Sequence, residues 1–284
     1  MGMNREFVKS ELARMNAEAD SIELIREKDG VIVARVQDGV FKGFVNPDFR
    51  REIDAYRILQ SLNVPTLRVL AHTDASLLLE DVNKSAVWRL GVEADMDDER
   101  VARVLAAWYR TLHAAGYAYV AQHGASLYDE NDVITRENLA YVREKTGTQD
   151  WPVWALIDRC WDGIMQKIRY ARRTLTYNDF YYTNLIVAHD GRAAMMFDYN
   201  LLGKGYAYAD VRNVCLALSA RAGAAFKEVY GAIDAQEAAL DEVAGILSAL
   251  HFACARNVFP SWGKQALDEL RVEMPRRIER LLET

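Results

Sequence analysis

Three residues with oxygen-bearing side chains are spaced along the segment from Leu175 to Asn200. Four residues separate Asp179 from Asn184, and Asp198 ends the apolar run that follows. A carboxylate can orient an attacking hydroxyl or accept its proton, and Mg²⁺ takes carboxylate and amide oxygens while it keeps waters and phosphate oxygens. An Asp, four residues, an Asn and then a second Asp is an order used in phosphoryl transfer. The spacing therefore predicts Asp179 as the catalytic residue and Asn184 and Asp198 as metal ligands.

A β-hairpin must position these side chains. The apolar runs Leu185–Ala188 and Ala194–Phe197 flank a polar turn that contains Gly191, a pattern typical of two paired strands. Two of the three residues precede the first strand, and the third follows the second. Because a hairpin brings its outer ends together, we expect the three side chains to converge although they span twenty positions.

The same residues have a plainer interpretation. Asp and Asn are common as loop caps, and an Asp after a strand is common as a turn residue. A single D-x-x-x-x-N match is therefore weak. The intervening strands and the second Asp, taken together, favour the catalytic interpretation.

The first part of the chain predicts an antiparallel sheet with a helix against it. Two Asp-Gly pairs, at positions 29–30 and 38–39, are strong signals for tight hairpins. Helical patterns cover residues 5–17 and a stretch from Pro47 to about Leu62. Strands are expected at Ser21–Arg26, Val31–Val36, Val40–Val45, Leu67–His72 and Ser76–Glu80. These elements predict a five-stranded unit over roughly residues 18–82.

From Asp97 onward, the apolar residues recur at the spacing of an α-helix. A helix is expected from Asp97 to about His113, with Gly116 stopping it, followed by a loop over residues 117–134. Further helices are expected near 135–145 and 153–171 and, after Asp210, to the end of the chain with breaks near positions 231 and 260. The change of period indicates a boundary near residue 83.

This order of parts resembles the aminoglycoside phosphotransferase and choline kinase family, the small-molecule branch of the protein-kinase-like fold. Besides the catalytic block, the stretches that are similar to the family are Val40–Gly43, Phe49–Leu59, Asn63–Leu70, Ser76–Val82, Thr111–Gly116 and Leu201–Val211. The resemblance implies an α+β, bilobal protein-kinase-like fold. Its N-terminal nucleotide-binding lobe, residues 1–82, would hold an antiparallel five-stranded sheet with one helix. Its larger, mainly helical C-terminal lobe, residues 83–284, would carry catalysis and acceptor binding.

The resemblance also implies roles for individual residues. Lys42 matches a lysine that contacts the α- and β-phosphates, and Glu52 matches the helix glutamate that pairs with it. Glu80 and Val82 match hinge positions whose backbone groups meet adenine. The implied cofactors are ATP and Mg²⁺, and the implied acceptor is a hydroxyl of an amino alcohol such as choline, an aminoglycoside or a sugar. The alternative for Lys42 and Glu52 is an exposed strand lysine and an exposed helix glutamate.

Two positions depart from the family pattern. Tyr177 stands where the family has a His two residues before the catalytic Asp, and its hydroxyl is expected to make the hydrogen bond behind the loop. The first hairpin turn, residues 27–30, reads Glu-Lys-Asp-Gly and lacks a Gly-, Ser- or Asn-rich phosphate cradle. These departures keep a second hypothesis open, a nucleotide- or ligand-binding pseudokinase of the same fold without turnover.

Aromatic and acidic residues near the motif could recognise a cationic acceptor. Aromatic faces bind quaternary ammonium groups, and carboxylates attract amines. The candidates are Tyr177, Tyr181, Tyr182, Trp151 and Trp154 among the aromatic residues, and Asp129, Glu130 and Asp132 among the acids. Packing of the catalytic loop and a solvated acidic loop explain the same residues equally well.

Composition limits the classes of partner. The chain has 284 residues, of which 51% are apolar and 27% charged, and its net charge is −6. An acidic chain is a poor match for nucleic acid, and no apolar stretch reaches the roughly 18 residues of a membrane span. The three cysteines are widely spaced, which predicts buried thiols rather than disulfides or a zinc site. Together with an N-terminus that lacks a signal-peptide core, these features predict a cytoplasmic protein, and they leave its oligomeric state open.

Overall fold

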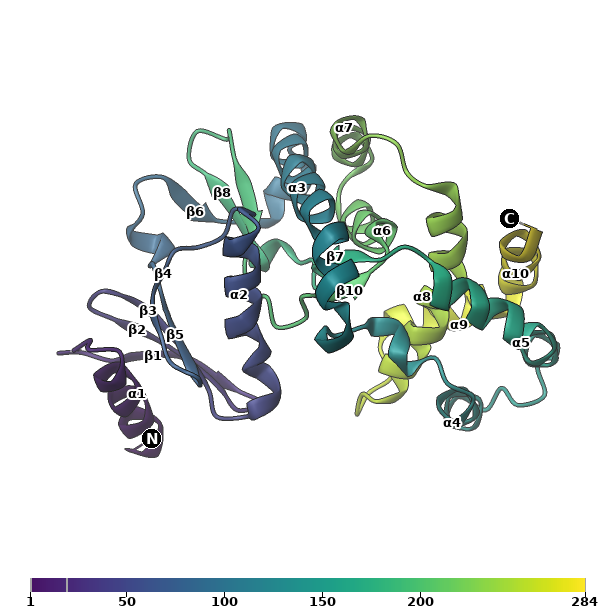
Figure 1. Cartoon of the computed structure of the whole chain (residues 1–284), viewed down its shortest axis with the longest axis horizontal. Helices are drawn as coiled ribbons and strands as arrows, with labels where there is room; N and C mark the ends of the chain where they lie inside the picture. The colour runs from purple at the N-terminus through teal and green to yellow at the C-terminus, as the bar shows by residue number, and fades with distance from the viewer. Residues whose placement is uncertain (1, 19, 284) are drawn as a thin grey trace. The chain divides into compact units, whose positions relative to one another are not determined.

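The computed structural model describes residues 2–18 and 20–283 of the chain (Figure 1). Its contacts divide it into two compact units that interleave along the sequence. Unit 1 comprises Met1–Ala115, Tyr177–Leu202 and Val214–Gly231, and unit 2 comprises Gly116–Thr176, Gly203–Asn213 and Ala232–Thr284. The lobe boundary expected near residue 83 stays a prediction.

Unit 1 contains the predicted five-stranded antiparallel sheet. Its strands are β1 (Glu23–Lys28), β2 (Val31–Val36), β3 (Gly39–Phe44), β4 (Val69–His72) and β5 (Ser76–Leu79), in the order β1-β2-β3-β5-β4. Asp29 and Gly30, which join β1 to β2, have φ angles of 53° and 80°. When both residues of a two-residue turn are left-handed, the turn has the same twist as the strands that flank it. The Asp-Gly pair at positions 29–30 therefore predicted this hairpin correctly.

Helices lie against both faces of this sheet (Figure 1). They are α1 (Gly2–Arg14) and α2 (Arg51–Ser61). Leu12 of α1 packs in a cluster with Ile32 and Phe41. Because side chains alternate along a strand, Lys42 faces the opposite side, where it meets α2.

A second sheet in unit 1 contains the predicted catalytic hairpin. Its strands are β6 (Trp88–Leu90), β8 (Leu185–Ala188) and β9 (Ala194–Met196), in the order β6-β8-β9. Strands β8 and β9 pair Leu185 with Met196, and their turn contains Gly191 at φ 71°. The hairpin and the five-stranded sheet therefore belong to one compact unit.

The rest of the chain is mainly helical, as the sequence predicts. The helices are α3 (Glu99–His123), α4 (Arg136–Thr146), α5 (Pro152–Tyr170), α6 (Ala207–Ala217), α7 (Ala220–Tyr230), α8 (Ala235–Cys254), α9 (Ser261–Val272) and α10 (Met274–Glu283). In unit 2, helices α4, α5, α8, α9 and α10 bury one apolar core around Trp154 and Leu250. Strands β7 (Thr174–Thr176) and β10 (Gly203–Gly205) pair in the same unit. Among the described residues, none of the helices combines the length and the apolar character that a membrane span requires.

Helix α3 contradicts one expectation, because it passes through Gly116 and ends at His123. The first part of the expected loop 117–134 is therefore helical. A Cβ at position 116 would lie 2.5 Å from the backbone nitrogen of Leu175 and 2.4 Å from Oγ1 of Thr174. Gly116 thus marks the place where β7 packs on the helix. The sequence shows the glycine but not the strand that approaches it from far along the chain.

We expect Gly116→Ala to lower the free energy of unfolding by about 1–3 kcal/mol, because the added methyl group forces β7 to move. Urea unfolding measures this change. Gly223→Ala in α7 is the matched control, since no atom lies within 4 Å of its added Cβ. Helix propensity alone then predicts a gain of about 0.5–1 kcal/mol. Equal effects of the two substitutions would contradict the packing explanation.

Candidate active site

The loop before β8 brings Asp179 and Asn184 together. Asn184 ends a single 3₁₀ turn, Tyr182–Asn184, directly before the strand. Its Nδ2 donates to Asp179 twice, to Oδ2 and to the backbone carbonyl oxygen, each at 3.2 Å. These bonds fix the orientation of the amide, and its Oδ1 is the atom that a cation would meet.

Asp198 follows β9 at the same end of the hairpin. The N–H of Phe197 donates to the carbonyl oxygen of Asn184 at 3.0 Å, which places the two predicted metal ligands next to one another. Asp198 has a φ of 63°, a left-handed conformation that Asp tolerates better than most residues. Its Oδ1 accepts from Nδ2 of Asn200 at 3.4 Å. Backbone held in this region among polar groups is typical of functional sites.

Lys42 on β3 bridges two carboxylates. Its Nζ lies 2.6 Å from Oε2 of Glu52 on α2 and 2.7 Å from Oδ1 of Asp198. Burial lowers the pKa of Lys42, but the two carboxylates outweigh burial and raise the pKa above its ordinary value. Burial also raises the pKa of Glu52, whose side chain is 1% exposed. The ammonium of Lys42 is shared between Glu52 and Asp198, so it compensates only partly for the water that the buried Glu52 carboxylate has lost.

These side chains line a cleft of about 400 Å³ that lies within unit 1. The apolar residues that line it include Val33, Val40, Leu67, Leu79, Val82 and Phe197. Of the residues predicted from the sequence, the cleft is lined by Lys42, Glu52, Glu80, Val82, Asn184 and Asp198. Asp179 is linked to the cleft through its hydrogen bonds with Asn184. Apolar walls beside a cluster of charges suit a ligand with a flat ring and a polyanionic tail.

Tyr177 fills the space behind the catalytic loop. It is fully buried, its hydroxyl donates to the carbonyl oxygen of Phe197, and its ring meets Trp108 and Tyr199 edge to face. Burial raises the pKa of Tyr177 well above its ordinary value, so the hydroxyl stays protonated and remains a donor. The residue next to Asp198 is thereby tied to the start of the catalytic loop, and Tyr177 packs instead of offering an open ring to an acceptor.

The other aromatic candidates fall into two groups. Trp154 is buried in the core of unit 2 and its Nε1 donates to Thr148. Trp151 is half-buried, and the guanidinium of Arg271 lies over its ring. Tyr181 and Tyr182 in unit 1 are 61% and 37% exposed. The two tyrosines are therefore the aromatic candidates that a ligand can reach.

The acidic candidates lie in unit 2. Asp129 is buried and its Oδ2 lies 3.0 Å from a guanidinium nitrogen of Arg173, whereas Asp132 is exposed. Burial raises the pKa of Glu130 to about 7, against the opposing effect of Arg212. Asp129 is thus engaged in structure, whereas the environment of Glu130 disfavours its charged form.

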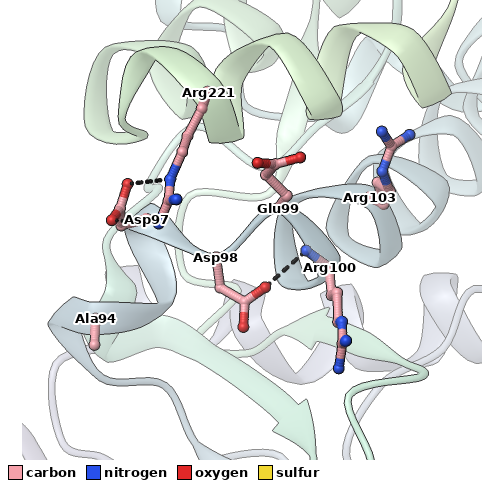
Figure 2. A pocket seen from close by; sticks show the side chains of 7 residues that line it. All are labelled: Ala94, Asp97, Asp98, Glu99, Arg100, Arg103 and Arg221. Atoms are coloured by element: carbon pink, nitrogen blue, oxygen red, sulfur yellow. Dashed lines mark hydrogen bonds and ion pairs between the residues drawn. The ribbon is translucent and has the colours of Figure 1, made fainter.

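A second hollow in unit 1, of about 530 Å³, has a different character (Figure 2). It is lined by Ala94, Asp97, Asp98, Glu99, Arg100, Arg103 and Arg221. Arg221 donates to Asp97 through two nitrogens, at 3.0 and 2.7 Å, and Arg103 pairs with Glu228 at 2.7 Å. Because the lining holds three acidic and three basic side chains, the hollow favours neither anions nor cations.

Asn200 and Arg35 are among the cleft residues that the sequence reasoning missed. Asn200 lines the cleft and donates to Asp198. Arg35 on β2 lines it too, and its Nε donates to Asp81 at 3.0 Å. Asn200 lies two residues after Asp198, which could have indicated that it is near the cleft. Side chains alternate between the two faces of β2, and this alternation could have placed Arg35 on the cleft side.

The chain matches known proteins both in sequence and in structure. The family model described as "Phosphotransferase enzyme family" (APH) matches residues 44–246. A choline/ethanolamine kinase family protein from Mesorhizobium loti aligns over 99% of both chains, with a TM-score of 0.62 and 13% identity. Macrolide 2′-phosphotransferase MphH from Brachybacterium faecium aligns over 94% of this chain and 97% of its own, with a TM-score of 0.59 and 17% identity. Choline kinase LicA from Streptococcus pneumoniae aligns over 99% of this chain and 100% of its own, with a TM-score of 0.61 and 12% identity. Among curated proteins, none matches the chain significantly.

At these identities the structural likeness shows the fold alone, which is α+β and protein-kinase-like, as predicted. The family match is a separate finding, because it comes from the sequence and spans residues 44–246 of 284. Glu52, Asp179, Asn184 and Asp198 all fall inside it. The chain therefore belongs to the phosphotransferase enzyme family.

Proposed function

We propose that this protein is a kinase that transfers the terminal phosphoryl group of ATP to a hydroxyl of a small molecule, with Mg²⁺ as its cofactor. Family membership supports the coarser activity, a small-molecule phosphotransferase. One observation carries the finer proposal: Lys42 contacts both Glu52 and Asp198, at 2.6 and 2.7 Å, inside a cleft with an apolar wall. Positioning and charge neutralisation of this kind supply most of the rate in phosphoryl transfer.

Asp179 is the proposed catalytic residue. One hydrogen bond from Asn184 reaches its carboxylate and a second reaches its backbone carbonyl oxygen, and a carboxylate held in this way can accept a proton from the acceptor hydroxyl. The acceptor oxygen then bonds to the terminal phosphorus as the bond from that phosphorus to its bridging oxygen breaks. The proton passes to Asp179, and ADP leaves.

The residues present fit a magnesium ion. The amide of Asn184 and the carboxylate of Asp198 are hard oxygen donors at one end of the hairpin. Among the described residues there is no group of three or more His, Cys, Asp or Glu side chains that could hold a metal. Two protein ligands completed by waters and phosphate oxygens are typical of Mg²⁺. When bound, the ion neutralises charge on the phosphates.

The hinge after β5 is the proposed adenine site. The N–H of Glu80 donates to the carbonyl oxygen of Arg68 at 3.0 Å, and the carbonyl oxygen of Val82 accepts from Ser85 at 3.1 Å. The proposed contacts use the other backbone group of each residue, the carbonyl of Glu80 for the amino group of adenine and the N–H of Val82 for a ring nitrogen. Similar structures were solved with nucleotides, LicA with AMP and APH(9)-Ia with ADP and spectinomycin, which supports a nucleotide as a ligand of this chain.

The proposed acceptor is a hydroxyl compound, and a cationic one is favoured. Among the similar structures, APH(2'')-IIia was solved with kanamycin and GDP, and others are choline or ethanolamine kinases. In this chain, the exposed ring of Tyr181 beside the proposed catalytic loop supports a cationic acceptor. Amino alcohols such as choline, aminoglycosides and sugars are the classes to test.

Ligand binding and turnover test this proposal. We expect ATP to raise the melting temperature, and to raise it further with Mg²⁺, and we expect one class of acceptor to stimulate ADP release. Binding of ATP without ADP release across a broad acceptor panel would favour a pseudokinase, the reading that the short β1–β2 turn supports. A melting temperature that no nucleotide changes would reject the kinase and the nucleotide-binding pseudokinase, and would leave a pseudokinase that binds another ligand.

The proposal also assigns a cellular compartment to the protein and a role to each part of the chain. Cys160, Cys215 and Cys254 are free thiols, which suits a reducing compartment, and we propose a cytoplasmic enzyme. Nucleotide binding is assigned to residues 1–82, and catalysis and acceptor binding to residues 83–284.

A further inference from the structure

The turn between β1 and β2 borders the cleft, yet it is a poor backbone cradle for phosphate. Such a cradle needs several successive N–H groups that point at the anion. This turn consists of Asp29 and Gly30 alone, and the carbonyl oxygen of Gly30 accepts from Val45 and Asn46 at 2.8 and 3.2 Å. A Cβ on Gly30 would lie 2.7 Å from Cβ of Asn46. The turn is therefore short and packed against Val45 and Asn46.

The side chains of β1 bring positive charge to the same place. Residues that are directly opposed in neighbouring strands share a face of the sheet. Arg26 is opposed to Val33, and Val33 is opposed to Lys42, so Arg26 and Lys42 lie in one row across three strands. Lys28 is opposed to Val31 and faces the same side. Both Arg26 and Lys28 line the cleft.

Glu27, which lies between them in sequence, faces the other side of the sheet. It is opposed to Ile32, whose side chain is buried in the cluster with α1. The residues that line the cleft include Arg26 and Lys28 but not Glu27. The sequence Arg-Glu-Lys thus gives the cleft two positive charges without the negative charge between them.

These two cations are also less neutralised than the other cations that line the cleft. Arg35 donates to two carboxylates, and so does Lys42. In the part of the chain that the structure describes, Arg26 forms no ion pair, and the carboxylate nearest to Lys28 is that of Asp29 at 3.8 Å, with both side chains more than 60% exposed. Arg26 and Lys28 can therefore serve a bound anion without breaking a close or buried ion pair.

We propose that Arg26 and Lys28 form a side-chain clamp for the outer phosphates of the nucleotide, in place of a glycine-rich backbone cradle. This inference rests on the proposed function. The clamp supplies guanidinium and ammonium donors, which form charge-assisted hydrogen bonds with phosphate. Because both side chains are exposed, their contribution weakens as salt rises, whereas that of the buried Lys42 changes little.

Calorimetric titration with ATP, ADP and AMP tests the clamp. We expect Arg26→Gln and Lys28→Met each to weaken ATP and ADP binding about fivefold to tenfold, and the double variant to weaken it further. AMP lacks the outer phosphates, so its affinity should stay within about a factor of two. Glu27→Gln, on the opposite face of the same strand, is the matched control and should not weaken ATP binding. The losses for ATP should shrink at high salt.

Two results would overturn the clamp while leaving the proposed function intact. One is a double variant that binds ATP as tightly as the wild type. The other is an equal loss for ATP and AMP, which would indicate a distorted sheet instead of lost phosphate contacts. A wild-type protein that binds none of the three nucleotides would instead reject the proposed function, and the clamp with it.

Discussion

Asp179→Asn lowers kcat by about a thousandfold, the range that a general base contributes, and leaves the affinity for ATP nearly unchanged. The amide of Asn keeps the size of the side chain but has no useful basicity. The acceptor hydroxyl would then keep its proton as the oxygen–phosphorus bond forms. Nucleotide affinity should change little, because Asp179 is assigned to the acceptor hydroxyl and is not among the residues that line the cleft.

Steady-state kinetics with the best acceptor of the panel, together with ATP titration, measures both quantities. Asp190→Asn is the matched control, because it removes one negative charge from the exposed turn of the same hairpin. Asn at position 190 can still accept the hydrogen bond from the N–H of Arg192, so kcat should stay at the wild-type level. An Asp179→Asn enzyme that keeps its kcat would refute the assignment of the base.

Asp198→Asn removes the part of the ATP effect on stability that depends on Mg²⁺. In the wild type, a nucleotide–metal complex at a hundred times its dissociation constant should stabilise the fold by about 2.7 kcal/mol. The variant has lost the one carboxylate among the two proposed ligands, so its response to ATP should be the same with and without Mg²⁺. Asn is preferred to Ala because the residue at this position has a φ of 63°, which Asn adopts at less cost than Ala.

Thermal unfolding with ATP, with and without Mg²⁺, gives the comparison. Asp190→Asn again serves as the control, and it should keep the full metal-dependent shift. Should Asp198→Asn keep the same shift, Asp198 is not a metal ligand. Should the variant instead lose all response to ATP even without metal, the main role of Asp198 is to hold Lys42, which it contacts at 2.7 Å.

Local signals account for the parts that the sequence predicted well. The Asp29-Gly30 pair specifies a two-residue turn through the left-handed φ of both residues. The catalytic hairpin was visible because two short apolar runs flank a glycine turn. Each of these signals lies within a few residues of the element it forms, so no knowledge of the tertiary structure was needed.

Features that depend on distant residues could not be found in this way. Gly116 looked like a helix stop because the strand against it, near Leu175, is remote in sequence. Tyr177 looked equally suited to ligand binding and to packing, and only the rings around it decide for packing. The link between Arg35 and Asp81 joins residues 46 positions apart, and no local pattern indicates it.

Strand β1 has a further consequence for the behaviour of the protein at high concentration. It is an edge strand, and all six of its residues are exposed, so its outer backbone groups could pair with an edge of another molecule. Charged side chains and an irregular register between Leu24 and Arg26 are features that discourage such pairing. The charges of β1 therefore help to keep separate molecules from joining edge to edge, and a strand stripped of them would promote aggregation.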